Sequence, residues 1–471
     1  MNFKVLLLLL SLLLCVAEIR VVNSHGIGSV GRATVLTVGA DGRIDLGSSL
    51  FFLNGIDTLK MLNHVTSLLK VMRNLTTSSI RVSSDSTASA SPQSTPTTLA
   101  PPSSISSEAA MNVSVLQISS GAYHVCALLD TTHGVRCWGA NFYGQLGIGN
   151  KTNLTSPPNY DVLTGVVQIS AGAAHTCALL NATGGVRCWG WNSYGQVGVS
   201  KPGVTDSPPT SDLLIGVARV AAGWDHTCVL MRGTGGVRCW GDNRFGQLGV
   251  GNISGPLGPS NIDIMTGAIS IAAGKFFTCV VLNETGGVKC WGNNTWGQLG
   301  TGDTSSLLRA SDSYILTGIS EIAAERFHAC ALGSNGTVFC WGWNGEGQLG
   351  INNNISYLTS PYVVPLSAKA TQVSVGYSNA CAVMNDRGGV TCWGDNMFGQ
   401  LGTGPSVIIP GFHIVLHGVA HVVEGVGSTC VLMNRTSGVR CWGSNGYGQL
   451  GIGDFLPLFS PPGRDIVFPL A

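Results

Sequence analysis

The sequence of 471 residues has little charge: Asp, Glu, Lys and Arg make up 10% of it, and the formal net charge is +1. A protein that holds nucleic acid by neutralising phosphates needs a basic surface, which this composition does not supply. After residue 24, no apolar run is long enough to cross a bilayer as a helix. These shortages argue against nucleic acid as a partner and against a membrane span.

Familiar catalytic and phosphate-binding motifs are also missing. The chain contains no G-x-S-x-G nucleophile elbow, no H-E-x-x-H zinc motif and no glycine-rich phosphate loop. Acidic residues of the long loops, such as Asp161 and Asp303, are too scattered for a catalytic carboxylate pair. We therefore predict no catalytic residue, no metal site and no cofactor, and we expect a protein that is not an enzyme.

What the chain does contain is a repeat, clearest from Gly172 to Gly198 (GAAHTCALLNATGGVRCWGWNSYGQVG). Its first cysteine recurs at a step of 51 residues five times and then at 49. Two short apolar runs around a glycine-rich turn are typical of a β-hairpin, not of a helix pair. The seven units are centred on the cysteine pairs Cys126 and Cys137, Cys177 and Cys188, Cys228 and Cys239, Cys279 and Cys290, Cys330 and Cys340, Cys381 and Cys392, and Cys430 and Cys441.

The residues around each hairpin resemble a known family. The pattern is G-x-x-H followed by W-G-x-N-x-x-G-Q-x-G, carried in the second unit by Gly172, His175, Trp189, Gly190, Asn192, Gly195, Gln196 and Gly198. It resembles the regulator of chromosome condensation repeat family, and is similar to the secreted propellers that inhibit β-lactamases. The resemblance implies an all-β fold, a seven-bladed β-propeller of four-stranded antiparallel blades. A kelch propeller has a comparable period but not the G-Q-x-G.

The strands of the second unit can be placed from its pattern. Strands A to D are expected at 166–170, 176–180, 185–189 and 212–215, with a long loop between C and D. Blade one has its own strand A at 115–119, and blade seven has its own strand D at 465–470. The ring therefore need not borrow a strand, although the resemblance also allows closure with strands from both termini, and the sequence leaves this choice open.

The cysteines fit disulfides within the hairpins. Pairing the strands around the turn places Cys177 opposite Cys188, where the Cβ atoms are close enough for a bridge. Two thiolates per hairpin are too few for zinc. We predict one disulfide in each of the seven units, which indicates an oxidising compartment. The family's nuclear members fill these positions with ordinary core residues.

The repeat region, 112–471, is preceded by three segments. Residues 1–24 predict a secretory signal peptide, cut after about residue 17 or 24, so we expect a secreted chain. Residues 25–75 do not repeat; 33–46 suggests a short hairpin, and 56–75 an amphipathic helix that either packs on its own chain or mediates self-association. Residues 76–111 form a Ser/Thr/Pro-rich linker.

Acceptors for N-glycans mark the surface that a partner cannot use. Nine of the eleven N-x-[ST] sites lie in predicted propeller loops. The eleven sites are Asn74, Asn112, Asn150, Asn153, Asn181, Asn252, Asn283, Asn293, Asn335, Asn354 and Asn434. The C–D loops of blades six and seven have none and carry apolar runs instead. Candidate partner-binding residues there are Val407, Ile408, Ile409, Phe455, Leu456, Leu458 and Phe459. The alternative is that these side chains pack on their own blades.

Other repeated residues are expected to be structural. Four units have a histidine at the A–B turn: His124, His175, His226 and His328. The other three units have Phe277, Asn379 and Ser428 there. Because phenylalanine can serve neither in acid–base catalysis nor as a metal ligand, the position is expected to be structural. The repeated tryptophans are expected between blades. The leading functional prediction is an extracellular or surface protein-binding propeller. Alternatives are a nucleotide-exchange regulator of a small GTPase, as in nuclear family members, and an extracellular hydrolase or lectin.

Overall fold

The computed structural model describes residues 113–199, 201–255, 258–351, 355–405 and 412–469, and the backbone of 37–38 and 44–45. The chain divides into two compact units, Met1–Ser104 and Ile105–Ala471. In the first, β1 (Thr37–Val38) and β2 (Ile44–Asp45) form an antiparallel pair, which is the hairpin predicted for 33–46. The predicted signal peptide, the helix at 56–75 and the linker at 76–111 lie outside the described residues.

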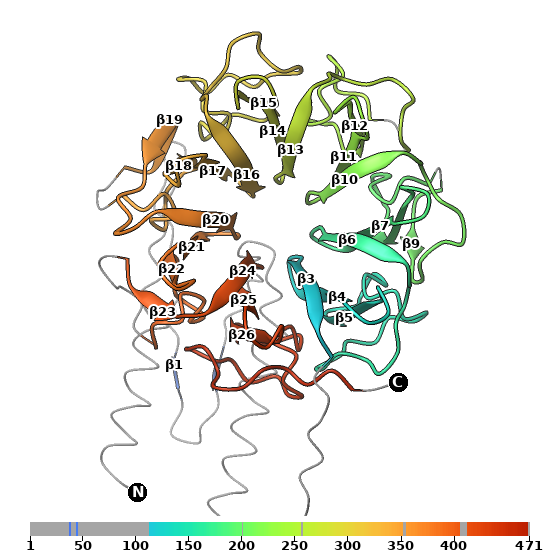
Figure 1. Ribbon diagram of the computed structural model, residues 1–471, viewed down its shortest axis with the longest axis vertical. Helices are drawn as coiled ribbons and strands as arrows, with labels where there is room; N and C mark the ends of the chain where they lie inside the picture. The colour runs from blue at the N-terminus through green and yellow to red at the C-terminus, as the bar shows by residue number, and fades with distance from the viewer. Residues whose placement is uncertain are drawn as a thin grey trace, which may run out of the picture. The chain divides into compact units, whose positions relative to one another are not determined.

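The second unit is a ring of seven antiparallel sheets, the blades of a propeller (Figure 1). The innermost strands, A, are β3 (Val115–Ser120), β6 (Val166–Ala171), β10 (Val217–Ala222), β13 (Ala268–Ala273), β16 (Ile319–Glu325), β20 (Ala370–Val375) and β24 (Val419–Glu424). Strands B are β4 (His124–Leu129), β7 (His175–Leu180), β11 (His226–Met231), β14 (Phe277–Leu282), β17 (His328–Gly333), β21 (Asn379–Met384) and β25 (Ser428–Met433). Strands C are β5 (Val135–Gly139), β8 (Val186–Trp191), β12 (Val237–Gly241), β15 (Val288–Gly292), β18 (Val338–Trp343), β22 (Val390–Gly394) and β26 (Val439–Gly443). The predicted all-β, seven-bladed class is thus confirmed.

The outer edge of the blades differs from the prediction. Within the described residues, a fourth strand pairs in three of the blades, as β9 (Val204–Thr205), β19 (Tyr357–Val363) and β23 (Ile414–Leu416). The strand D predicted at 212–215 is wrong, because this segment makes a single bridge, Val186 to Leu214. No strand forms at 465–469 either, although the Ile466 N–H bonds the Val439 carbonyl. Each segment bonds strand C through a single residue, Val186 or Val439, so the pairing does not extend into a ladder.

The core lies between the blades. Strands B are buried along nearly their whole length, as in β7, where all six residues are buried. One such interface joins Leu179 and Val186 of blade two to Val220 and Trp240 of blade three. A strand covered on both faces reads as a continuous apolar run, which explains segments such as HTCALL.

All seven predicted disulfides are present, one in each hairpin. They join Cys126 to Cys137, Cys177 to Cys188, Cys228 to Cys239, Cys279 to Cys290, Cys330 to Cys340, Cys381 to Cys392, and Cys430 to Cys441. Each bridge links strand B to strand C of its own blade, and the two cysteines are direct partners in the strand register, as between β7 and β8. All fourteen side chains are buried, so the bridges lie in the cores between blades, and none of these fourteen sulfurs is a free thiol.

In the described part of the chain, no helix is long and apolar enough to cross a membrane.

The ring closes between blades seven and one. Among the described residues, each of these sheets contains only consecutive strands, β24-β25-β26 and β3-β4-β5, and none from another part of the chain. Val115 and Trp138 share a core with Leu432, Ile466 and Phe468. The C-terminal segment thus seals the joint between the last blade and the first (Figure 1).

Candidate functional site: the A–B face

The order of the strands gives the propeller two unlike ends. Because A, B and C are antiparallel neighbours, the A–B turns and the start of the C–D loops emerge together, and the B–C turns lie opposite. Backbone hydrogen bonds join the two groups, for example from the Trp191 N–H to the Ala174 carbonyl at 2.9 Å. We call this end the A–B face; it comprises the seven A–B turns (223–225 in blade three) and the first turns of the C–D loops (242–247).

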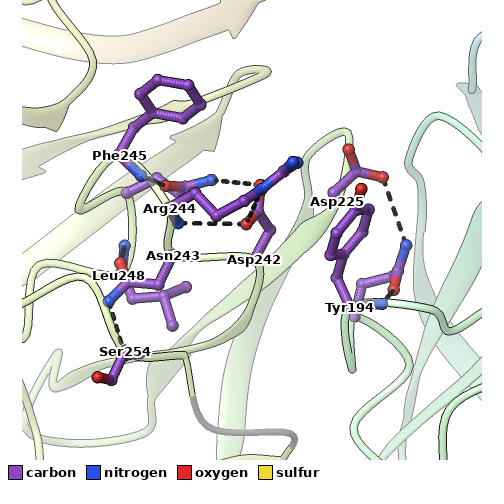
Figure 2. Close-up of polar contacts among 10 residues, drawn as sticks. Tyr194, Asp225, Asp242, Asn243, Arg244, Phe245, Leu248 and Ser254 are labelled. Carbon is purple, nitrogen blue, oxygen red and sulfur yellow. Dashed lines mark hydrogen bonds and ion pairs between the residues drawn. The ribbon is translucent and has the colours of Figure 1, made fainter.

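The repeated polar residues hold each C–D loop rigid. In blade three, the Asn243 side-chain oxygen accepts the Leu248 N–H at 3.0 Å, and its amide nitrogen donates to the Ser254 carbonyl at 2.7 Å (Figure 2). The Gln247 side-chain oxygen accepts the Phe245 N–H at 3.0 Å. These bonds satisfy backbone groups of the loop, and they hold residues 244–246 in one conformation.

Tryptophans tie each loop to the next blade. The Trp291 indole donates to the Gln247 carbonyl oxygen at 3.0 Å. Each of the other strand C tryptophans makes the same bond to the preceding blade, in blade one from Trp138 to Gln449. The predicted position of these rings between blades is therefore confirmed, and neighbouring loops are held at a fixed distance.

The repeated histidines are also structural. His226 Nε2 lies 2.9 Å from the Thr278 hydroxyl of the next blade, and that hydroxyl donates to the Gln247 carbonyl at 2.8 Å. The hydroxyl hydrogen is thus committed, so Nε2 must donate to the oxygen. Burial lowers the pKa of His226 to about 4 and of His175 to about 3. These histidines are uncharged at neutral pH and unsuited to general acid–base catalysis.

The rigid loops present a row of aromatic side chains that the sequence analysis missed. The residue before the Gly-Gln of each loop is aromatic in six blades and acidic in the fifth: Tyr143, Tyr194, Phe245, Trp296, Glu346, Phe398 and Tyr447. The A–B turns add further rings, and the two groups meet, as in Phe245 with Phe276 at 4.6 Å and Tyr123 with Tyr447 at 5.0 Å between ring centres. The signal was visible as an aromatic column in the aligned units.

Two cations lie over the rings of blades three to six. The Lys275 ammonium is 4.6 Å from the Trp224 ring centre, and the Arg326 guanidinium is 3.8 Å from that of Tyr377. Trp224 and Tyr377 themselves lie 5.6 Å apart. Burial, together with the Arg326 charge, lowers the pKa of Lys275. The pairing of positive charge with π-faces fixes both cations in place.

A third cation is anchored by a buried acid (Figure 2). Arg244 Nε and Nη2 donate to the two Asp242 oxygens at 2.8 and 3.0 Å, and the guanidinium lies 4.5 Å from the Tyr194 ring centre. The Asp242 side chain is 1% exposed and that of Arg244 is 53% exposed. Nearby Asp225 has a pKa raised to about 6, first by burial and then by the charge of Asp242. Arg244 is thus an exposed arginine held in one orientation.

A groove of about 380 Å³ crosses the same face between blades five and seven. Its walls are Arg326, Trp343, Glu346, Tyr377, Asp395, Met397 and Phe398, with backbone of blade seven. Burial and the neighbouring Asp395 raise the pKa of Glu346. The groove combines apolar rings with two acids and one base, a mixture suited to a protein side chain and not to a purely apolar ligand.

The apolar side chains of the two predicted partner-binding loops differ in exposure. Phe455, Leu456 and Phe459 are exposed, and the Phe459 carbonyl accepts the Gly404 N–H, which joins the C–D loops of blades seven and six. Leu458 packs into the adjoining cores and bridges to Gly443, so for this residue the packing alternative holds. Val407, Ile408 and Ile409 lie outside the described residues. Partner binding by these loops stays a prediction.

The described glycan acceptors divide by exposure. Exposed asparagines are Asn150, Asn181, Asn252, Asn283, Asn335 and Asn434; Asn153 is partly buried; Asn74, Asn112 and Asn354 lie outside the described residues. Asn293 is 8% exposed, and its side-chain oxygen accepts from Gln298 at 2.8 Å, so this predicted acceptor is inaccessible in the folded chain. Among described residues, no exposed acceptor lies in an A–B turn.

No group of three or more His, Cys, Asp or Glu side chains that could hold a metal ion occurs in the part of the chain that the structure describes.

Comparisons with known families agree with this architecture. The family model described as "RCC1-like domain" matches residues 86–379, and the regulator of chromosome condensation (RCC1) repeat matches residues 370–400. A seven-bladed propeller with these repeats defines the class, and the chain belongs to the RCC1-like domain family.

Individual relatives match different shares of the chain. The ultraviolet-B receptor UVR8 of Arabidopsis thaliana is 32% identical over 300 residues, covering 62% of this chain and 67% of UVR8. The probable E3 ubiquitin-protein ligase HERC4 of Homo sapiens is 34% identical over 202 residues, covering 41% of this chain. The match spans only 19% of the length of HERC4.

Solved structures share the fold at low identity. Human WBSCR16 superposes with a TM-score of 0.61 at 21% identity, covering 70% of this chain and 92% of that one. Yeast RCC1 (Prp20) superposes with a TM-score of 0.57 at 21% identity, covering 66% and 78%.

Proposed function

We propose that this chain is a secreted, disulfide-bonded, N-glycosylated propeller without catalytic activity, which binds an extracellular or cell-surface protein through its A–B face. The observation that carries the proposal is the composition of that face. Tryptophan, tyrosine and arginine are the residues most enriched at binding hot spots, and here they are gathered on one end of the ring.

The rigidity of the face supports the same proposal. Arg244 is held by Asp242 and Tyr194, and Lys275 and Arg326 rest on aromatic rings before any partner arrives. Ordering a flexible side chain at an interface costs about 0.5–1.5 kcal/mol, so groups that are already fixed bind at lower cost.

The disulfides and the N-glycan acceptors support the proposal that the chain is secreted. Seven disulfides form readily in the secretory pathway and are rare in the cytosol and nucleus. The predicted signal peptide and the six exposed acceptors fit that route. Prp20p, a nearby fold, is described by its binding to Gsp1p and histones, but the bridges disfavour such a role for this chain.

Photocrosslinking tests the position of the binding surface. Phe245 is exposed on the A–B face, and it is replaced by the photocrosslinker p-benzoylphenylalanine. We expect a discrete covalent adduct with a partner protein when the secreted protein is irradiated in the presence of cells of the organism that produces it. The same label at exposed Ile215, on the opposite end of the ring, should form none.

The adduct must depend on the face itself. Arg244→Ala should reduce it at least tenfold, whereas Arg232→Ala, a matched change at an exposed arginine of a B–C turn, should leave it unchanged. Equal adducts from Phe245 and Ile215, or an adduct that Arg244→Ala does not weaken, would contradict the proposal.

A further inference from the structure

Two glutamates break the repeat at the inner end of strand A. The last position before the A–B turn is glycine in six blades but Glu325 in blade five. One position earlier, blades one to six have serine, alanine or valine, and blade seven has Glu424. Both changes place an acid where the other blades have small, uncharged residues, next to the axis of the ring.

The two acids line one cavity at the centre of the A–B face. Its walls come from the A–B turns of blades one, two and seven (Ser120–Ala122, Ala171–Ala173 and Gly425–Val426), with Glu325 on the opposite side. The cavity volume is about 20 Å³, which is room for one group the size of a water molecule.

The hydrogen bonds leave one carboxylate oxygen open. The Trp224 indole donates to Glu325 Oε1, and the Ser374 hydroxyl donates to Glu424 Oε2. Glu424 is 6% exposed, yet its Oε1 has no hydrogen-bond partner among the residues that the structure describes. A buried acceptor without a donor is costly, so this oxygen is matched to a donor that enters the cavity.

We propose that this cavity binds a primary ammonium group, such as the lysine side chain of a protein docked on the A–B face. An ammonium is compact and has three donors, enough for both carboxylates and a backbone carbonyl. Calcium needs six to eight oxygens, and a guanidinium is too broad for the volume. Ala122, Ala173 and Val426 offer an apolar wall for a lysine stem. The lysine source rests on the proposed function.

The surrounding charges set how binding depends on pH. Burial raises the pKa of Glu325 to about 7 and that of Glu424 to about 8. Lys275 and Arg326 lie near Glu325, and His328, opposite it on β17, is uncharged because burial lowers its pKa to about 4. The strands packed on Glu424 (β3, β20, β21, β25) contain no charged residue. Ammonium binding therefore displaces protons, and affinity should rise from pH 6 to 9.

Calorimetry with n-butylammonium on the full secreted chain tests the site. We expect saturable binding at pH 8 with proton release, detected by comparing buffers of different ionisation enthalpy. Glu424→Gln and Glu325→Gln should each weaken it at least tenfold. Glu284→Gln, at an exposed B–C turn, is the matched control and should not change it. Tetramethylammonium, which has no N–H donor and is too large, should not bind.

A further variant distinguishes loss of ammonium binding from loss of the fold, and the Phe245 crosslink tests the proposed function independently. Glu325→Gly restores the residue of the other blades, so it should keep the thermal unfolding profile and still lose butylammonium. No saturable binding, unchanged binding in Glu424→Gln, or equal binding of tetramethylammonium would overturn the inference. The Phe245 crosslink does not use the cavity, so it can succeed when this test fails.

Discussion

At the scale of single residues, blades two and four differ together at the A–B turn position and at the residue that faces it from the next blade. His175 Nε2 lies 2.9 Å from the Thr227 hydroxyl. In blade four the same position is Phe277, and the next blade has Ala329 at the position of Thr227. The phenylalanine ring lies over Gly274 much as the imidazole lies over Gly172. In these two blades a ring covers the glycine, and the imidazole pairs with a threonine hydroxyl that the neighbour of Phe277 lacks.

A double-mutant cycle tests this dependence. His175→Phe removes the donor to Thr227, and Thr227→Ala removes the acceptor of the His175 N–H, so each change should cost about 1–3 kcal/mol of unfolding free energy. The double variant reproduces the blade four pair and should cost at least about 1 kcal/mol less than the sum. Denaturant unfolding of the oxidised protein measures all four; additive costs would show that the two positions are independent.

At the scale of elements, the hairpin was predictable and the outer edge was not. The predicted strand at 166–170 is observed as Val166–Ala171, because its pattern and its partner are local in sequence. The segment at 212–215 makes one bridge only, and its Leu213 and Leu214 pack on the core shared with blade three, which is distant in sequence. The candidate site divides in the same way: the aromatic column was readable, whereas Lys275 over Trp224 requires two blades in place.

Peptide mapping of protein from its natural host tests the hairpins as elements. We expect none of the fourteen propeller cysteines to be alkylated before reduction, because all are buried in bridges. Blade four offers a paired test of glycan exposure: Asn283, at an exposed B–C turn, should be occupied, and Asn293 should not. Free thiols in most hairpins would exclude the secreted assignment, and a glycan at Asn293 would contradict the loop structure.

At the scale of the whole molecule, closure makes the first and last blades neighbours. The Trp138 indole reaches the Gln449 carbonyl at 3.1 Å, across 311 positions of the chain, and the Val115 N–H reaches the Ser437 carbonyl at 3.0 Å. A closed ring leaves no end blade with an open apolar face. The A–B face and its central cavity exist only in the closed state, because blades one, two, five and seven must meet at one axis.

The C-terminal segment provides a test of closure with its own control. Phe468 is 7% exposed and lies edge-on to Trp138, with ring centres 5.8 Å apart, whereas the preceding Val467 is 69% exposed. Phe468→Ala leaves a void between blades seven and one, and should lower the unfolding free energy by about 3–5 kcal/mol. Val467→Ala should change it by less than about 0.5 kcal/mol. Both are measured by denaturant unfolding with the disulfides intact. If the two variants are equally stable, the interface between blades seven and one does not depend on this segment. If only Phe468→Ala is destabilised, and if it also loses the Phe245 crosslink, ring closure and the A–B face form one cooperative unit.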